Sequence, residues 1–205
     1  WLPGVVRGEV QLGWAHQEPV RGQLAATARR QDGAWRLTGS KCCVLGAPNC
    51  AQFVVSARGA EDGATLLFLV DAGAAGVRVE AGRLIDGSAA GDLYFADAEA
   101  RPLAGLGPAQ AGAALAHLLD TGVTAACAEM VGLMDGALAL TVDYLRSRQQ
   151  FGRPIGANQA LQHRAVDMLI ALEQSRSLVL SLALSLAGRN DLAGGAGRFH
   201  AAKVL

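Results

Sequence analysis

Aromatic residues are scarce in this sequence, and neither sign of charge is in excess. Phe, Trp and Tyr make up 5% of the 205 residues, and 18 Lys and Arg balance 18 Asp and Glu, so the formal net charge is zero. A protein that binds nucleic acid or an anionic membrane surface through its charge needs a basic patch. The composition therefore predicts neither of these as a partner.

Cysteine is also rare, and its spacing does not suit a metal site. Four cysteines, Cys42, Cys43, Cys50 and Cys127, form no Cys-x-x-Cys pair. Adjacent residues of a strand point to opposite faces, so Cys42 and Cys43 would not share a metal ion. We therefore expect buried free thiols and no metal. Motifs for a serine nucleophile elbow, a P-loop, a Gly-rich dinucleotide turn and paired histidine ligands are missing as well.

Long apolar runs without charge are missing too. The segment LIALEQSRSLVLSLALSLAG, for example, carries charges, and no basic region precedes an apolar segment at the start. The sequence predicts neither a transmembrane helix nor a signal peptide, and we expect a cytoplasmic protein. Hydrophobic residues make up 51% of the chain, which is enough to bury the core of one globular domain or two small ones.

Residues 1–104 have the pattern of a small antiparallel β domain, a sandwich or barrel, in a chain of the α+β class. Short segments follow one another, separated by turn sequences such as DG, GAP and AGAAG at the spacing typical of such a fold. Seven strands are expected, at EVQLGWA, GQLAATARR, GAWRLTGSKCCVL, CAQFVVSAR, ATLLFLVDA, GVRVEAG and DLYFADA.

Residues 105–205 have the 3.6-residue period of helices from about Pro108 onward, which predicts a long antiparallel helical bundle. We expect one helix to end at Arg148 and the next to begin at Pro154, since proline is favoured in a first helical turn. Two apolar stripes are expected to form the core: Leu115, Leu119, Ala126, Met130, Leu133, Met134, Ala137 and Thr141, then Leu161, Ala165, Met168, Leu172, Val179, Leu182 and Leu186.

Three glycines interrupt the first of these helices. Gly122, Gly132 and Gly136 should each cost about 1 kcal/mol relative to alanine, so we expect another helix or a ligand to approach the backbone closely there. Beyond the second helix, RNDLAGGAG is typical of a loop and FHAAKVL of the start of a third helix. Because that helix is not completed, we expect the sequence to be a fragment.

The corner between the two helices carries the sharpest chemical signal. The segment YLRSRQQFGRPIGANQ brings together Arg148, Phe151 and Gln159: a fixed cation with five donors, a flat apolar ring and an amide. That set suits a phosphate-bearing aromatic ligand.

The order of these parts, with EP near an early strand, GSKCCVLG in a later one and RQQFGRPIGANQALQHRAVDM at the corner, resembles the acyl-CoA dehydrogenase family. The similarity covers that family's middle β domain and the first part of its C-terminal helical domain. QEP, GSKCCVL and FGRPIGANQALQHRAVDMLIALEQ are most similar to the small-subunit type of pimeloyl-CoA dehydrogenase.

The resemblance implies FAD-dependent α,β-dehydrogenation of an acyl-CoA thioester, in which a glutamate takes the α-proton and the β-hydride passes to flavin N5. Such a reaction needs a base beside the α-carbon, hydrogen bonds on the thioester oxygen and a flavin stacked on the acyl chain. The resemblance also implies a homo- or hetero-oligomer, a dimer of dimers, and an electron-transfer flavoprotein as electron acceptor.

The family's cofactor contacts map onto two segments of this sequence. Arg148, Gln150, Phe151 and Gln159 correspond to residues that meet the adenosine-diphosphate end of an FAD held by a neighbouring subunit. The segment near the flavin ring is matched by Gln17, Cys43, Val44 and Leu45. His16, beside Gln17, is expected either near the flavin or, more simply, as a core histidine.

Several positions depart from the family's pattern. The glycine-rich turn after EP is EPVRGQ here, Cys43 replaces the Trp over the flavin, and Leu45 replaces the hydroxyl that meets flavin N5. Of the substrate-flanking Asp and Arg, Asp120 is kept and Val123 replaces the arginine. The base comes from beyond the end of this chain in many members, and from the position of Gly122 in a minority; Glu129, two turns later, is a weak substitute.

These departures leave several readings open. The chain is either a dehydrogenase subunit or a catalytically deficient structural partner that completes the FAD site of an unlike subunit. An acyl-CoA oxidase or a flavin monooxygenase-like relative would keep the fold and change the electron acceptor. A scaffold without cofactor lies outside the family. Small residues such as Ala125, Ala126 and Gly132 leave room for a bulky acyl group, or serve helix packing.

Overall fold

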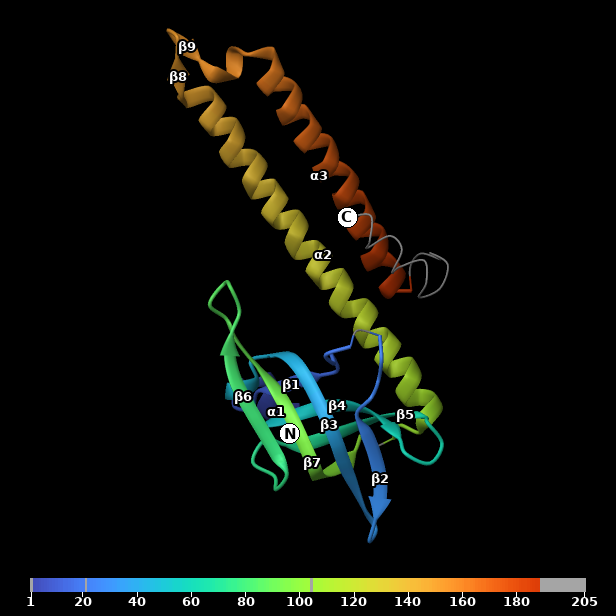
Figure 1. Cartoon of the computed structure of the whole chain (residues 1–205). Helices are drawn as coiled ribbons and strands as arrows, with labels where there is room; N and C mark the ends of the chain where they lie inside the picture. Colours follow the sequence, from blue (N-terminus) through green and yellow to red (C-terminus); the bar gives the residue numbers. More distant parts are fainter. Residues whose placement is uncertain (1, 21, 104, 189–205) are drawn as a thin grey trace. The chain divides into compact units, whose positions relative to one another are not determined.

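A computed structural model describes residues 2–20, 22–103 and 105–188 (Figure 1). The chain divides into two compact units, residues 1–115 and 116–205. A short helix, α1 (Leu2–Val6), precedes the strands of the first unit. The expected loop and third helix after residue 188 lie outside the described residues.

The first unit is built around a β-barrel. All seven expected strands are confirmed: β1 (Leu12–Ala15), β2 (Thr27–Gln31), β3 (Ala34–Leu45), β4 (Gln52–Gly59), β5 (Thr65–Asp71), β6 (Val77–Arg83) and β7 (Ala89–Pro102). Strands β4, β2, β3, β7 and β5 pair in that order, and β5 pairs back to β4, which closes a ring. Such closure leaves few free sheet edges.

The expectation of a purely antiparallel sheet was wrong. Strands β1 and β2 both run parallel to β4, while the other pairs are antiparallel. Alternating polarity identifies strands but not the direction of their neighbours. The barrel interior is filled by alternate residues of these strands, including Leu37, Phe53, Val55, Phe68 and Leu93.

A β-bulge interrupts β3 in its pairing with β7. Lys41 lies opposite Leu93 and Val44 lies opposite Gly91, so the intervening residues on β3 outnumber those on β7. A 3-10 turn, η1 (Ala47–Asn49), follows the strand. Because of the extra residue, the side chains of β3 do not alternate regularly between the two faces of the sheet across the bulge.

Two long helices follow: α2 (Pro108–Ser147) and α3 (Gln159–Leu186). The corner between them contains the two-residue strands β8 (Gln149–Gln150) and β9 (Arg153–Pro154) and a 3-10 turn, η2 (Ile155–Ala157). Pro154 therefore lies before α3, not in its first turn as expected. Its backbone is extended, at φ −56° and ψ 138°. This φ is close to the value that the proline ring imposes, so proline fits the end of a strand.

The two helices run antiparallel within the second unit (Figure 1). Asp135 of α2 pairs with Arg176 of α3 at 3.1 Å, and Thr141 and Leu145 share a groove with Leu161 and Met168. The less exposed residues follow four-and-three spacing on both helices: 120, 124, 127, 131, 134, 138, 141 and 145 on α2, and 161, 165, 168, 172, 175, 179, 182 and 186 on α3. This is the spacing of a coiled-coil seam.

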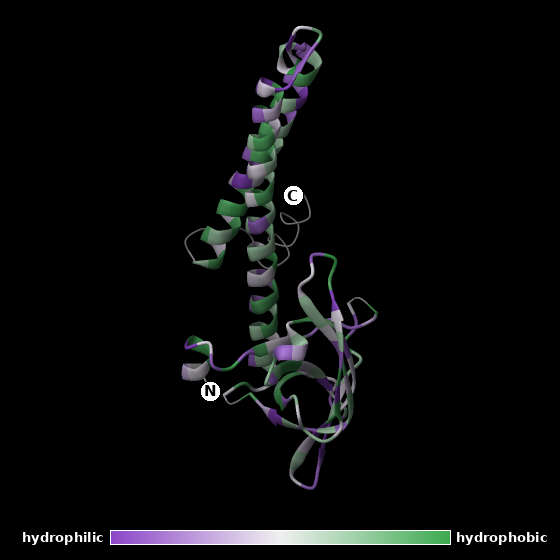
Figure 2. Ribbon diagram, turned by 90° about the vertical axis from the view of Figure 1, so that its left-hand side faces the viewer, coloured by the Kyte–Doolittle hydropathy of each residue, from purple (hydrophilic) through white to green (hydrophobic). Residues whose placement is uncertain are grey.

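The expected stripe of α3 is confirmed by this seam, whereas that of α2 was largely wrong. Leu119, Met130 and Leu133 are exposed, and so are Ala126 and Ala137. Apolar residues recur along α2 and α3 (Figure 2). Because α2 is apolar on more than one face, the period alone does not determine which face meets α3.

The glycines of α2 have no close neighbour in this chain. A Cβ atom added at Gly122, Gly132 or Gly136 would meet nothing within 4 Å among the described residues. Both α2 and α3 are also long and apolar enough to cross a membrane by length and composition alone. The structure therefore does not bear on the expected close approach, and the expected lack of a membrane span is not confirmed.

Candidate functional site

A buried ion pair lies next to the segment that the resemblance places at the flavin ring. Glu18 follows β1 and Lys41 stands within β3, and Lys41 Nζ donates to Glu18 Oε1 at 2.6 Å. The two side chains are 3% and 0% exposed. Water is thus excluded from both charges, and each must find its partners inside the barrel.

The remaining donors and acceptors of this pair are also used. Lys41 Nζ donates to the His16 backbone oxygen at 3.3 Å and to Ser56 Oγ at 3.4 Å. Glu18 accepts from the Ala25 and Ala26 backbone N–H groups at 2.6 and 3.1 Å. The pair therefore ties β1, β3 and β4 to the start of β2.

His16 belongs to the same network, which supports its interpretation as a core histidine. His16 Nδ1 lies 2.8 Å from Ser56 Oγ, and its ring stacks on Trp14 with centroids 5.7 Å apart. Burial, with the charge of Lys41, lowers the pKa of His16 below its ordinary value of 6.5. Burial by itself raises the pKa of Glu18, but hydrogen bonds from Lys41, Ala25 and Ala26 outweigh it and lower the value.

Gln17 is exposed between the two tethered residues His16 and Glu18. Its backbone oxygen accepts from the Cys42 N–H at 2.8 Å, which joins the end of β1 to the bulge of β3. A cavity of about 170 Å³ opens beside it, lined by His16, Gln17, Glu18, Gly22, Gln23, Leu24, Thr65 and Leu115.

The bulge sets the directions of the next three predicted contacts. Cys43 has a φ of 54°, a left-handed conformation that is costly for a side chain with a Cβ atom. Its N–H donates to Asp92 Oδ1 at 2.9 Å. Cys43 and Leu45 are exposed, whereas Val44 is 2% exposed and points into the barrel core. Only the backbone of Val44 is available to a ligand.

The cysteines match the expectation of buried free thiols only in part. All four are free; Cys50 and Cys127 are buried, Cys42 is half-buried and Cys43 is exposed. Burial raises the pKa of the Cys42 and Cys50 thiols. Among the described residues, no group of three or more His, Cys, Asp or Glu side chains is placed to hold a metal ion.

The corner of the second unit is a tight hairpin. Gln150 pairs with Arg153 across β8 and β9, and the two residues between them, Phe151 and Gly152, have φ values of 53° and 77°. Positive φ at both central residues is what a type I′ turn requires. Glycine adopts it freely, but Phe151 does so under strain and with its side chain fully exposed.

The hairpin is fixed to both helices. The Ile155 N–H donates to the Arg148 backbone oxygen at 2.9 Å, and a Cβ atom added at Gly156 would lie 2.8 Å from the Leu145 oxygen, which only glycine permits. Arg148, Gln150 and Gln159 are exposed around this corner. Within the described part of the chain, the Arg148 guanidinium makes no ion pair.

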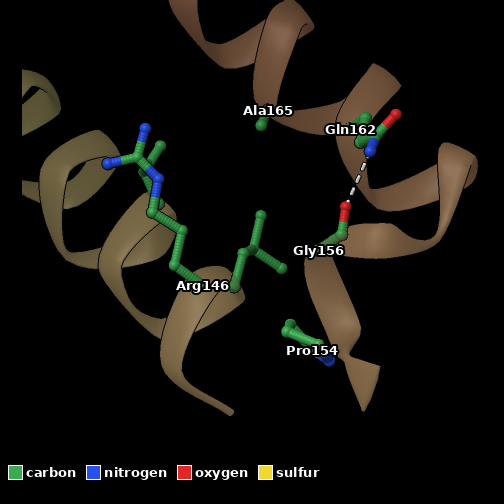
Figure 3. Close-up of a pocket in the computed structure, with 7 residues that line it drawn as sticks. Arg146, Pro154, Gly156, Gln162 and Ala165 are labelled. Atoms are coloured by element: carbon green, nitrogen blue, oxygen red, sulfur yellow. Dashed lines mark hydrogen bonds between the residues drawn. The ribbon is translucent and has the colours of Figure 1, made fainter. Parts of the chain in front are cut away.

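An apolar groove of about 380 Å³ lies beneath the corner, between the end of α2 and the start of α3 (Figure 3). Its lining residues are Val142, Leu145, Arg146, Pro154, Gly156, Gln162 and Ala165. Gln162 Nε2 donates to the Gly156 oxygen at 2.8 Å, as the dashed line in Figure 3 marks. The groove gives the corner an apolar underside.

The predicted substrate residues and the weak base candidate lie on α2. Asp120 is half-buried and its backbone oxygen accepts from Thr124 Oγ1 at 2.8 Å. Gly122 and Glu129 are exposed, and Val123 is half-buried. Glu129 is not among the residues that line the cavities described above.

The exposed side chains that are predicted to bind the cofactor thus form two groups, each within one unit. One group lies on the barrel and the other at the corner: Gln17, Cys43 and Leu45, then Arg148, Gln150, Phe151 and Gln159. Sequence reasoning missed the pairing of Glu18 with Lys41. Its signal was present, since these residues are the Glu of EP and the Lys of GSK, but two motifs 23 residues apart do not reveal that they touch.

Comparison with known proteins decides the family. Residues 18–98 match the model of the acyl-CoA dehydrogenase middle domain, and residues 112–205 match that of the acyl-CoA dehydrogenase C-terminal domain. The chain belongs to the acyl-CoA dehydrogenase family.

Individual members of this family are moderately similar. An L-prolyl-[peptidyl-carrier protein] dehydrogenase of Pseudomonas fluorescens is 31% identical, over 87% of this chain and 50% of its own length. A variant of the Tcur3481-Tcur3483 steroid ACAD is 35% identical with a TM-score of 0.78, over 99% of this chain and 58% of that one.

The ChsE4-ChsE5 complex from Mycobacterium tuberculosis is 30% identical with a TM-score of 0.72, over 89% of this chain and 48% of that one. The chain therefore spans about half the length of the relatives it matches. Its expected resemblance to the acyl-CoA dehydrogenase family is confirmed by these comparisons.

Proposed function

We propose that this chain is a subunit of an FAD-dependent acyl-CoA dehydrogenase and supplies part of a shared FAD site. The observation that carries the proposal is the corner of the second unit, where Phe151 is held in a strained, fully exposed position beside Arg148. Strain of this kind persists where the surrounding structure enforces it, and it clusters at ligand sites.

The groups at the corner fit the adenosine-diphosphate end of FAD. Arg148 offers a planar cation for a phosphate, Phe151 a ring face for a flat base or for apolar contact, and Gln150 and Gln159 offer amides. All four are exposed, as expected of groups that meet a cofactor bound mainly by another subunit.

The barrel would supply the flavin-ring end of a second site. Gln17, Cys43 and Leu45 present exposed side chains there, and Val44 its backbone. FAD, when bound, supplies the acceptor for the hydride that leaves the β-carbon of the acyl group. The role of these residues is to bind and orient the ring; the sequence offers no flavin-facing hydroxyl at Leu45.

Asp120 and Gly122 are proposed to lie beside the acyl-CoA substrate. The base that takes the α-proton is proposed to come from outside this chain, because Gly122 has no side chain to supply it and Glu129 is exposed on α2 away from the described cavities. The middle domain, residues 1–104, would thus contact flavin and thioester, and residues 105–205 would contribute the helical part.

Purification of the chain alone, and together with an unlike dehydrogenase subunit, tests this proposal. A yellow complex that an acyl-CoA thioester bleaches is the expected result. Arg148→Ala should lower FAD affinity of that complex by about tenfold or more, since a charge-assisted contact to phosphate is worth about 1.5–3 kcal/mol. A colourless complex under all conditions would overturn the proposal.

A second candidate function is that of a structural partner subunit without its own active site. It is favoured by Leu45, which is 64% exposed and carries no donor, and by Val123 in place of a charged residue. One similar structure is that of a complex of two proteins, ChsE4 and ChsE5. A homo-oligomer of this chain that is yellow and bleached by acyl-CoA would exclude this role.

The assembly is proposed to be a homo- or hetero-oligomer, a dimer of dimers, with an electron-transfer flavoprotein as acceptor. The apolar faces of α2 and α3 would then pack against other helices of the assembly, not cross a membrane, and the protein would be cytoplasmic. Recovery of the complex in the supernatant after ultracentrifugation without detergent is expected. Fast reoxidation of the reduced, substrate-bound flavin by oxygen would favour an oxidase.

A further inference from the structure

The buried pair Glu18 and Lys41 joins the two barrel segments that carry the predicted flavin contacts. Gln17 lies directly before Glu18, and Cys42 directly after Lys41. The Cys42 N–H donates to the Gln17 oxygen at 2.8 Å, so the two segments are in contact at the residues next to the ion pair. The ion pair and this backbone hydrogen bond therefore link the same two segments side by side.

The charge of Glu18 also organises the turn after β1. Its two carboxylate oxygens accept from Lys41 Nζ at 2.6 Å, Ala25 N–H at 2.6 Å and Ala26 N–H at 3.1 Å. The backbone at Ala25 and Ala26, just before β2, is thus held against the carboxylate. Three donors converge on one buried side chain, which fixes its direction in space.

Lys41 fixes the other segment in the same way. Its three ammonium protons are matched by Glu18 Oε1, the His16 oxygen and Ser56 Oγ. Two residues further along, Cys43 turns into the left-handed region at φ 54° and its N–H is held by Asp92. The bulge that exposes Cys43 and Leu45 therefore begins at an anchored residue.

Stability alone does not account for such a pair. Replacing a buried ion pair with apolar side chains of similar volume is often neutral or stabilising, because burial of two charges costs nearly as much as their attraction returns. What the pair adds over two apolar side chains is direction, since the hydrogen bonds hold specific backbone groups in place.

We propose that Glu18 and Lys41 are positioning residues that hold Gln17 and the Cys42–Leu45 bulge in the geometry that receives the flavin ring. Both side chains are buried, so their proposed role is to act through Gln17 and the bulge. The inference rests on the proposed function as far as flavin is concerned, but the positioning itself is a property of this chain.

The test compares three variants in the complete complex with the unlike subunit: Lys41→Met, Glu18→Leu, and the double variant Glu18→Leu/Lys41→Met. The single variants leave one buried charge unpaired and should lose thermal stability. The double variant leaves no buried charge unpaired and should regain part of the lost thermal midpoint, although the Ala25 and Ala26 amides still lack their acceptor. It should bind FAD about tenfold more weakly than the unsubstituted complex, with an altered visible circular dichroism of the flavin.

Arg29→Met is the matched control, because it also removes a cation from an ion pair of the barrel, Arg29–Asp97 at 2.8 Å, where both side chains are exposed. It should leave both the FAD affinity and the flavin spectrum unchanged. A double variant with the same FAD affinity and spectrum as the unsubstituted complex would overturn the positioning role.

A measurement without flavin separates this inference from the proposed function. In the chain alone, the double variant should increase hydrogen exchange at the Ala25, Ala26 and Cys42 amides while β4 and β5 remain protected. Failure of the proposed function would leave this result intact. Unchanged exchange at all three amides would overturn the inference even if FAD binds to the complex.

Discussion

At the residue scale, Phe151 is the side chain whose conformation and exposure are hardest to reconcile with stability alone. A fully exposed ring adds little to the fold, and its left-handed backbone costs about 1–2 kcal/mol. Asparagine tolerates that conformation better, so Phe151→Asn keeps the turn and removes the ring. We expect this variant to be at least as stable and to bind FAD less tightly in the complex.

Thermal unfolding and FAD titration of the same preparation check this prediction. Gly152→Ala provides the opposite control, since it strains the turn at φ 77° and retains the ring. That variant should unfold at a lower temperature than the unsubstituted protein. Equal FAD affinity in Phe151→Asn and the unsubstituted complex would contradict a cofactor role for the ring.

The buried network around His16 makes the barrel sensitive to acid. Burial lowers the pKa of His16 from 6.5, and the hydrogen bonds of Glu18 lower its pKa from 4.5. When a folded-state pKa is depressed, the unfolded chain binds the proton first, so stability is lost as pH falls below the ordinary value. We expect a first decline of the thermal midpoint below about pH 6.5 and a second below about pH 4.5.

His16→Gln should remove the first decline and leave the second. Differential scanning calorimetry from about pH 8 to about pH 2 would measure both, since the second decline begins only below about pH 4.5.

At the element scale, the seam between α2 and α3 leaves the glycines of α2 facing open space. Because a Cβ atom at Gly132 or Gly136 meets nothing within 4 Å in the part of the chain that the structure describes, alanine there should stabilise the isolated chain by about 1 kcal/mol per site. If another helix or a ligand approaches that backbone closely in the assembly, the same substitutions should weaken the complex.

Chemical denaturation of the chain and sedimentation of the complex measure the two effects separately. Gly122→Ala tests the position beside the proposed substrate. If alanine stabilises the complex as much as it stabilises the isolated chain, the close approach expected from the sequence is contradicted.

Element types were predictable from the sequence, and their mutual contacts were not. Turn sequences between short apolar segments located all seven strands, and residues such as Phe53 and Val55 on β4 lie in the barrel core. The parallel pairing of β1 with β4 is a long-range choice that local pattern does not encode. The 3.6-residue period located the stripe of α3, whereas on α2 it also included Met130 and Leu133, which are exposed.

The candidate site shows the same division. Arg148, Phe151 and Gln159 were identified from their chemistry and the resemblance, yet the type I′ turn that strains Phe151 was missed. Its sequence, Phe-Gly, lacks the Asn-Gly or Asp-Gly signature of such turns. Pro154 was assigned to α3 because proline favours both a first helical turn and an extended strand end.

At the scale of the whole molecule, α2 exposes apolar side chains that we expect a partner to cover. Leu133 and Leu140 are 68% and 74% exposed on the helix surface away from the α3 seam. The two residues are seven apart on α2, so they lie on one helix face, and exposed apolar side chains that gather on one face are typical of an interface. We expect Leu133→Gln with Leu140→Gln to dissociate the complex or to raise its dissociation constant by tenfold or more, about 1.4 kcal/mol.

Ile85, which is fully exposed at the turn between β6 and β7, provides a matched control. Ile85→Gln removes an exposed aliphatic side chain from a turn of the barrel and should leave the assembly intact. Analytical ultracentrifugation compares the three proteins. An unchanged assembly in the α2 double variant would place the interface elsewhere.

Strand order in the barrel also bears on how the chain folds. Leu12 of β1 pairs with Gln52 of β4, and Thr27 of β2 pairs with Arg58 of the same strand, so the ring closes only after long loops have been ordered. The helix hairpin needs only the short corner between α2 and α3. Non-local closure is slow and local contact is fast. In refolding followed by pulsed hydrogen exchange, the α2 and α3 amides should therefore gain protection before those of β4, although the barrel precedes them in the chain.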